Sequence, residues 1–196
     1  YWRLSSARWD QIKVPTYSVG NWGGFSMHLR GNTEGFMNAA AKHKKLRVHT
    51  GSHFHPFHSE EGRMDQLRWF DYWLKGQDTG IMDEPPVKLE IRSGGSEKPY
   101  PFRFENEWPL KRTKWTKLYL KPERRTVGGP DEVEGTLAKS APKTRTALSY
   151  TASGVTKAGV ASGSSLSTTH GNTGRTGVAF VTPPMAEDTE ITGPLV

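Results

Sequence analysis

Four of the seven histidines of this 196-residue chain lie in one short stretch, between residues 49 and 58. An imidazole can transfer protons near neutral pH or bind a metal ion. The pattern His-x-His-x-x-His, with Glu60 or Glu61 beside it, could ligate zinc if the rings converge. Because the spacing lacks the helical His-Glu-x-x-His geometry and no cysteine is present, we expect no metal site and favour proton transfer. The cluster consists of His49, His53, His55 and His58.

The segments around this cluster predict a strand, a helix and a second strand. Residues 12–19 and 44–51 are short stretches with β-branched or apolar residues, flanked by glycine or proline, as is typical of strands. Between them, residues 35–45 have an alanine-rich middle and a basic end, which favours a helix. A strand, helix and strand at this spacing form a βαβ unit, and such units build parallel sheets.

Two loops then lie at the carboxyl ends of the predicted strands, where open α/β sheets bind their ligands. The first is the glycine-rich turn from Gly20 to Gly24, and the second runs from Gly51 to His58. We expect catalytic side chains in these loops. The nearest approach to a nucleophilic turn is Gly24-Phe25-Ser26-Met27-His28, but its last position needs a small residue, so Ser26 is a poor nucleophile candidate.

Long runs of the chain resemble the CocE/NonD hydrolases, which are relatives of the X-Pro dipeptidyl-peptidases. The resemblance covers about residues 9–120, and the tail VAFVTPPMAEDTEITGPL resembles the start of the β-sandwich that follows the hydrolase domain in that family. It implies an α/β fold: the last strands and helices of an α/β-hydrolase domain, followed by the start of a jelly-roll β-sandwich. The matching runs are NWGGFSMHLRGNTEGF, VHTGSHFHPF, QLRWFDYWLKGQDTGIMDEPPVKLEIR and ENEWPLKRTKWTKLYL.

The resemblance assigns His53 as the catalytic general base, although a plain surface histidine is the alternative. The family's acid ends a Gly-Trp-x-Asp turn, and Gly24 occupies that position here. Glu34 could substitute as the acid, but a capping or solvent-facing role suits it better, and an upstream Asp is equally open. Trp22, in the same turn, becomes a candidate substrate contact.

The implied activity is hydrolysis of an ester or amide bond, including X-Pro dipeptide bonds, by a Ser-acid-His mechanism. The serine would lie outside this chain, so we expect the 196 residues alone to be inactive and to need no cofactor. The expected partners are a small ester, amide or peptide substrate, and the missing part of the enzyme or a second copy. The alternatives are a noncatalytic β-rich binding module and a histidine-cluster metal-dependent hydrolase.

Two domains are expected, with residues 1–84 in the hydrolase part and residues 85–196 in a partial X-Pro dipeptidyl-peptidase C-terminal-like β-sandwich. Residues 122–177, rich in Gly, Ser and Thr, are expected to form mainly loops with short, weak strands at 136–137 and 147–150. Two further strands are expected at 178–182 and 187–196. Residues 60–75 predict a helix that ends at Gly76 and packs its apolar residues on the sheet. Those apolar residues are Met64, Leu67, Phe70 and Leu74.

The formal charge of +7 raises the question of nucleic-acid binding. Basic residues cluster at 42–47 and 111–121, yet no recognition-helix, zinc-finger or RNP-like pattern accompanies them, so a generic basic surface is favoured. No apolar run approaches the roughly 18 residues of a membrane span. We therefore expect neither nucleic acid nor membrane as a partner. The sequence does not fix the compartment, with the cytoplasm slightly favoured.

Overall fold

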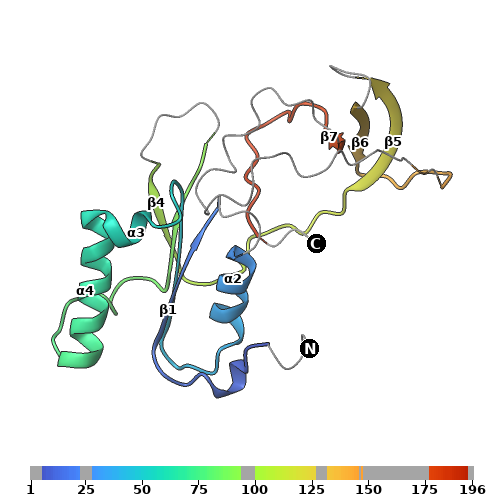
Figure 1. The fold of residues 1–196 in the computed structure, drawn as a ribbon. Coiled ribbons are helices and arrows are strands. Elements are labelled where there is room, and N and C mark those ends of the chain that lie inside the picture. Colours follow the sequence, from blue (N-terminus) through green and yellow to red (C-terminus); the bar gives the residue numbers. More distant parts are fainter. Residues whose placement is uncertain are drawn as a thin grey trace, which may run out of the picture. The chain divides into compact units, whose positions relative to one another are not determined.

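The computed structural model describes residues 6–22, 28–93, 100–126, 132–145, 147 and 177–193. The chain divides into two compact units. One comprises Tyr1–Lys111 with Gly193–Val196, and the other comprises Arg112–Thr192. The described strands form one sheet in each unit (Figure 1). None of the helices in the described ranges is both long and apolar enough to span a membrane.

The first unit contains a four-stranded mixed sheet. The strands β1, β2 and β3 run parallel to one another, and β4 pairs antiparallel with β3. The carboxyl ends of the three parallel strands therefore meet at one edge. In sheet order, the strands are β1 (Thr16–Asn21), β2 (Lys44–His49), β3 (Val87–Glu90) and β4 (Phe102–Glu105).

Helices lie on both sides of this sheet, with α2 on one face and α4 on the other (Figure 1). The crossover from β1 to β2 contains α2, whereas α3 and α4 follow β2. The helices are η1 (Trp9–Gln11), α2 (Leu29–Asn38), α3 (His55–His58) and α4 (Glu60–Lys75). The predicted parallel β1–β2 pair with a helical crossover is confirmed.

The central strand β2 has one apolar face and one charged face, because successive side chains alternate across a strand. Leu46 and Val48 are fully buried and belong to the core on the α2 side. Arg47, only 2% exposed, forms an ion pair with Asp65 of α4 on the opposite side. The apolar core cluster contains Phe36, Leu46, Val48, Val87, Leu89, Trp108 and Leu110.

A buried charge network joins α4 to the second face of the sheet. Asp65 accepts hydrogen bonds from Arg47 Nη1 at 2.7 Å, Lys88 Nζ at 3.1 Å and Tyr17 Oη at 3.2 Å. Glu61, one turn earlier, pairs with the same Arg47 and Lys88. Burial alone would raise the pKa of Asp65, but the charge and hydrogen bond of Lys88, the charge of Arg47 and the hydrogen bond of Tyr17 lower it. The helix is therefore held by carboxylates that satisfy buried cations.

The crossover helix begins and ends earlier than the alanine-rich run suggests. It spans Leu29–Asn38 instead of residues 35–45, and Ala39 already has extended backbone, with φ −59° and ψ 136°. Residues 39–43 instead form the connection that leads from the end of α2 to the start of β2. The expected stabilisation by a cation at the helix end still occurs, because Lys44 Nζ donates to the carbonyls of Met37 at 3.2 Å and Ala39 at 2.9 Å.

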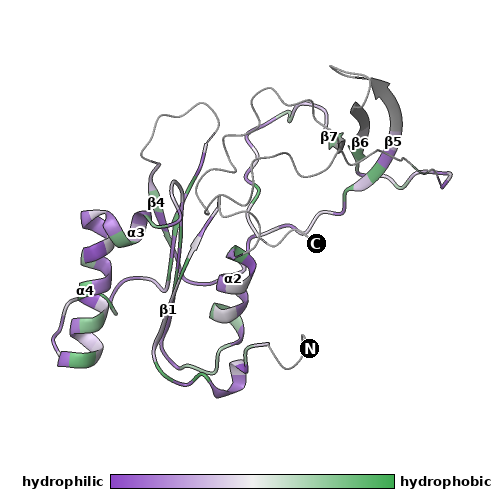
Figure 2. Cartoon of the chain, viewed as in Figure 1, coloured by the Kyte–Doolittle hydropathy of each residue, from purple (hydrophilic) through white to green (hydrophobic). Residues whose placement is uncertain are grey.

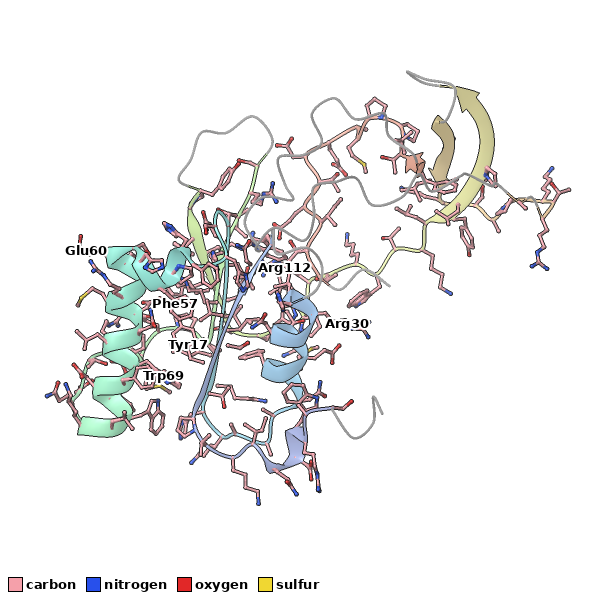
Figure 3. The ribbon with its side chains drawn as sticks, in the orientation of Figure 1. Tyr17, Arg30, Phe57, Glu60, Trp69 and Arg112 are labelled. Carbon is pink, nitrogen blue, oxygen red and sulfur yellow. The ribbon has the colours of Figure 1, made fainter. Side chains whose placement is uncertain are left out.

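Helix α4 has the expected limits, with Ser59 as its N-cap and the left-handed Gly76 at its C-terminus. The predicted buried face is wrong, because Met64, Leu67, Phe70 and Leu74 are all exposed, Leu74 by 77%. Asp65 and Trp69 face the sheet instead, and the Trp69 ring lies 5.3 Å from the Tyr17 ring (Figure 3). Hydrophilic and hydrophobic residues accordingly alternate along α4 (Figure 2).

The strand after the Pro-Pro pair belongs to the first sheet. β3 lies within residues 85–196, the segment predicted as the second domain, and it pairs with β2, with Leu46 N donating to the Pro86 carbonyl at 2.8 Å. The contacts divide the chain after Lys111. The prolines therefore direct the chain back beside β2 instead of away from it.

The second unit contains a three-stranded sheet in the order β5 (Tyr119–Thr126), β6 (Glu132–Ala138) and β7 (Gly177–Val181). The predicted strands at 136–137 and 178–182 correspond to parts of β6 and β7, so residues 122–177 include regular strand as well as loop. Residues 187–193 contain no strand, contrary to expectation. The strand expected at 147–150 lies, apart from its first residue, outside the described residues.

Candidate active site

The ends of β1, β2 and β3 come together at the edge of the sheet where the histidine loop begins. Trp22 follows β1 directly, and its backbone N–H donates to the His49 carbonyl at 2.9 Å. Its indole Nε1 donates to the Glu90 carbonyl at the end of β3, also at 2.9 Å. The expectation that the two loops share one edge is confirmed for their described parts.

A buried carboxylate fixes the residue after β2. Glu90 Oε2 accepts from the Thr50 backbone N–H at 2.7 Å, and Oε1 accepts from the Thr50 hydroxyl at 2.6 Å. Both residues are only 9% exposed. Hydrogen bonds to a charged acceptor are short and strong, so this pair holds the root of the histidine loop in a single position.

The next residue, Gly51, is held from the opposite side. Asn21 Nδ2, buried at the end of β1, donates to the Gly51 carbonyl at 2.9 Å. Gly51 has φ 82°, in the left-handed region that glycine adopts without strain. The loop root therefore has an anchor on each neighbouring strand.

His53 lies two residues beyond this anchored root, directly before Phe54, the N-cap of α3. It is half-buried, and its ring centre lies 5.2 Å from that of His28 and 5.5 Å from that of Phe54. Within the described ranges, no carboxylate forms a hydrogen bond or ion pair with its imidazole. The position at the carboxyl end of a parallel strand is the one expected from the sequence.

The other predicted site residues take different positions. Glu34 lies on α2, 40% exposed, where it accepts from Asn38 Nδ2 at 2.9 Å and lies 4.0 Å from Arg30 Nε. Arg30 points away from the sheet (Figure 3), so Glu34 belongs to a solvent-facing helix surface. Trp22 packs against Trp108 with ring centres 6.3 Å apart. Gly24 and Ser26 lie outside the described residues.

The histidine cluster does not converge on a metal site. Among the residues that the structure describes, no three His, Asp or Glu side chains are arranged to hold a metal ion. His49 is buried in the sheet with Nδ1 2.8 Å from the Thr50 carbonyl oxygen, and burial lowers its pKa. His55 and His58 are exposed residues of α3. The cluster thus separates into one structural histidine and three near the loop surface.

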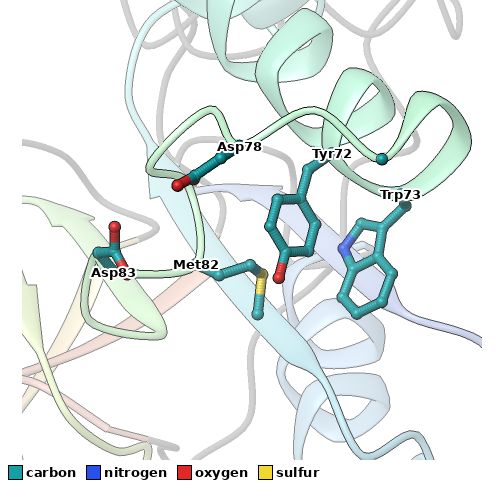
Figure 4. Close-up of a pocket in the computed structure, with 6 residues that line it drawn as sticks. Tyr72, Trp73, Asp78, Met82 and Asp83 are labelled. Carbon is teal, nitrogen blue, oxygen red and sulfur yellow. The ribbon is translucent and has the colours of Figure 1, made fainter.

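A surface pocket of about 510 Å³ lies at the other end of α4 (Figure 4). Its walls come from the last turn of the helix and the turn that follows. Tyr72 is twelve residues beyond Glu60, which is roughly 18 Å along the helix axis. The pocket is therefore separate from the histidine loop. Its lining residues are Tyr72, Trp73, Gly76, Asp78, Met82 and Asp83.

Sequence patterns did not identify three residues that fix the loop root, namely Glu90, Thr50 and Asn21. Each is a common polar residue at a strand end, and no motif distinguishes it. The only available signal was position, since all three follow or end strands that the sequence suggests. Their importance comes from contacts between residues 30 and 40 positions apart.

Residues 79–196 match the family described as the X-Pro dipeptidyl-peptidase C-terminal non-catalytic domain. The match covers more than half of the chain, so the chain belongs to this family. It begins before β3 and therefore includes Glu90. No curated protein matches the chain.

Two crystal structures of a CocE/NonD family hydrolase from Staphylococcus aureus are similar to this chain. Each is 28% identical with a TM-score of 0.58, and the match covers 71% of this chain and 23% of the hydrolase. The resemblance to CocE/NonD and X-Pro dipeptidyl-peptidase proteins is thus confirmed. The mixed sheets with few helices fit a C-terminal region related to these hydrolases.

Proposed function

We propose that this chain supplies the histidine-bearing part of a serine hydrolase that cleaves ester or amide bonds, with X-Pro dipeptides among the candidate substrates. His53 would take the proton of the serine hydroxyl during attack on the carbonyl and return it to the leaving group. Water would then release the acyl group with His53 again as the base. The observation that carries this proposal is the position of His53 in the loop after β2, at the carboxyl edge of the parallel strands.

The serine is proposed to come from outside these 196 residues. The chain spans 23% of the length of the Staphylococcus aureus hydrolase, which leaves most of such an enzyme to be supplied elsewhere. We place the acid outside as well, because the oxygens of Glu34 are engaged with Asn38 and Arg30 on α2. The 196 residues alone would then be inactive until they associate with the rest of the enzyme.

In this proposal the first sheet is the end of an α/β-hydrolase domain, and the second sheet is the start of a jelly-roll β-sandwich. The parallel strands with helices on both faces support the first assignment. The antiparallel β5–β6 pair and the family match support the second.

A fluorophosphonate probe, which reacts with activated serines, tests the proposal on the protein expressed from its complete gene. Mass spectrometry should place the label on a serine outside residues 1–196. The purified 196-residue chain should remain unlabelled. A label on Ser26, or on any other serine within these residues, would refute the proposal that the nucleophilic serine lies outside them.

A noncatalytic binding role is the second candidate, favoured by the match of residues 79–196 to a family of non-catalytic C-terminal domains. It predicts that the complete protein binds its ester or peptide ligand but shows no turnover and no labelled serine. Binding that survives His53→Ala, together with absent labelling, would support this role over the hydrolase.

A further inference from the structure

Glu90 is a buried carboxylate whose two oxygens both serve one residue, Thr50. A buried charge is costly unless hydrogen bonds compensate it, so this arrangement is held firmly in place. Glu90 lies on β3, within the segment that matches the non-catalytic domain. Thr50 belongs to the loop that carries His53. The contact therefore joins the non-catalytic segment to the candidate catalytic loop.

Beyond this root, the loop is held by its own turn, in which His55 N donates to the Ser52 carbonyl at 3.0 Å and Phe54 N donates to Ser52 Oγ at 3.4 Å. The ring of His53 contacts the rings of His28 and Phe54, and its backbone follows the anchored residues Thr50 and Gly51. A misplacement of about 1 Å in a reacting group can lower a rate by roughly 100-fold. The orientation of His53 thus depends on the geometry set three residues earlier.

We propose that Glu90, through Thr50, is a positioning residue that aims His53 for proton transfer. The segment described as non-catalytic would then contribute directly to the activity. This inference rests on the proposed role of His53. Asn21, which holds the Gly51 carbonyl from β1, completes the anchor.

The test uses the complete protein and the rate of fluorophosphonate labelling per folded molecule. Thr50→Val removes the hydroxyl while preserving the shape, and we expect the maximal labelling rate to fall about tenfold with unchanged probe affinity. Thr50→Ser, which keeps the hydroxyl, should restore most of that loss. Glu90→Gln, which keeps the length of the side chain, should resemble Thr50→Val. Thr33→Val is the matched control, because its hydroxyl donates only to the Arg30 carbonyl on the exposed side of α2.

Amide hydrogen exchange separates positioning from general stability. In Thr50→Val, exchange should accelerate at the amides of residues 50 and 55, which donate to Glu90 and to the Ser52 carbonyl, and stay unchanged at 46–48 in the centre of β2. Unchanged labelling in both Thr50→Val and Glu90→Gln, or faster exchange throughout the sheet, would overturn the positioning role. If His53→Ala labels at the normal rate, the proposed function itself is refuted, and the proposed role of Glu90 in positioning His53 is refuted with it. Loss of labelling in His53→Ala beside normal labelling in both Thr50→Val and Glu90→Gln refutes only the positioning.

Discussion

Replacing Asp65 by Asn is expected to weaken the first unit far more than an ordinary surface substitution. Asp65 accepts hydrogen bonds from Arg47, Lys88 and Tyr17. Arg47 is 2% exposed, so water cannot replace the lost carboxylate. Breaking a buried ion pair by removing one partner costs about 3–5 kcal/mol. Glu61 still pairs with Arg47 and Lys88, so we expect the lower end, about 3 kcal/mol.

The matched control is Asp71→Asn in the same helix. Asp71 pairs with Lys75 at 2.7 Å, and although the Asp71 side chain is only 16% exposed, the lysine is 59% exposed, so water can solvate the ammonium and such an i,i+4 pair contributes about 0.5 kcal/mol. Urea unfolding followed by tryptophan fluorescence provides the measurement. At a slope of about 1.5 kcal/mol per M, Asp65→Asn should lower the midpoint by roughly 2 M. If the two variants shift the midpoint equally, the charged face does not hold α4 as described.

Three further predictions concern stability of the first unit. Burial lowers the pKa of His49 below 6.5, so the unfolded chain binds the proton first as pH falls. The free energy of unfolding should therefore decrease below about pH 6.5, and His49→Gln should remove this part of the slope in urea titrations. Gly51→Ala should cost about 1 kcal/mol because of its positive φ, whereas Gly31→Ala, in open space on α2, should stabilise by up to about 1 kcal/mol. Trp69→Ala should cost about 3 kcal/mol and Leu74→Ala under about 0.5 kcal/mol. Equal losses would indicate that Leu74 packs on the sheet, as the sequence pattern predicts.

Local patterns predicted the part of the fold in which neighbouring residues determine the outcome. The strand, helix and strand order predicted the parallel β1–β2 pair, and this placed His53 at the correct edge. The Gly76 end of α4 follows from capping chemistry within one turn. The same reasoning put the crossover helix too late, because the alanines have high helix propensity but are needed to lead into β2.

Burial was harder to predict, because it depends on residues distant in sequence. Charged residues usually indicate a solvated face, yet Arg47 is buried because Asp65, eighteen positions later, satisfies it. The charged face of the sheet therefore packs against Asp65 of α4, and the apolar residues of the helix are exposed instead. Glu90 was missed for the same reason, since its partner Thr50 lies forty positions earlier. Pair contacts of this kind leave no periodic signal.

The most direct test of the account is chemical rescue of His53→Ala in the complete protein. If His53 is the general base, its loss should slow fluorophosphonate labelling by at least about 100-fold, and added imidazole should restore part of the rate. The control variant is His58→Ala, which replaces an exposed histidine of the same loop region. It should label like the unaltered protein and show no response to imidazole. Labelling of His53→Ala at the normal rate would contradict the central claim that this loop carries the base of a serine hydrolase.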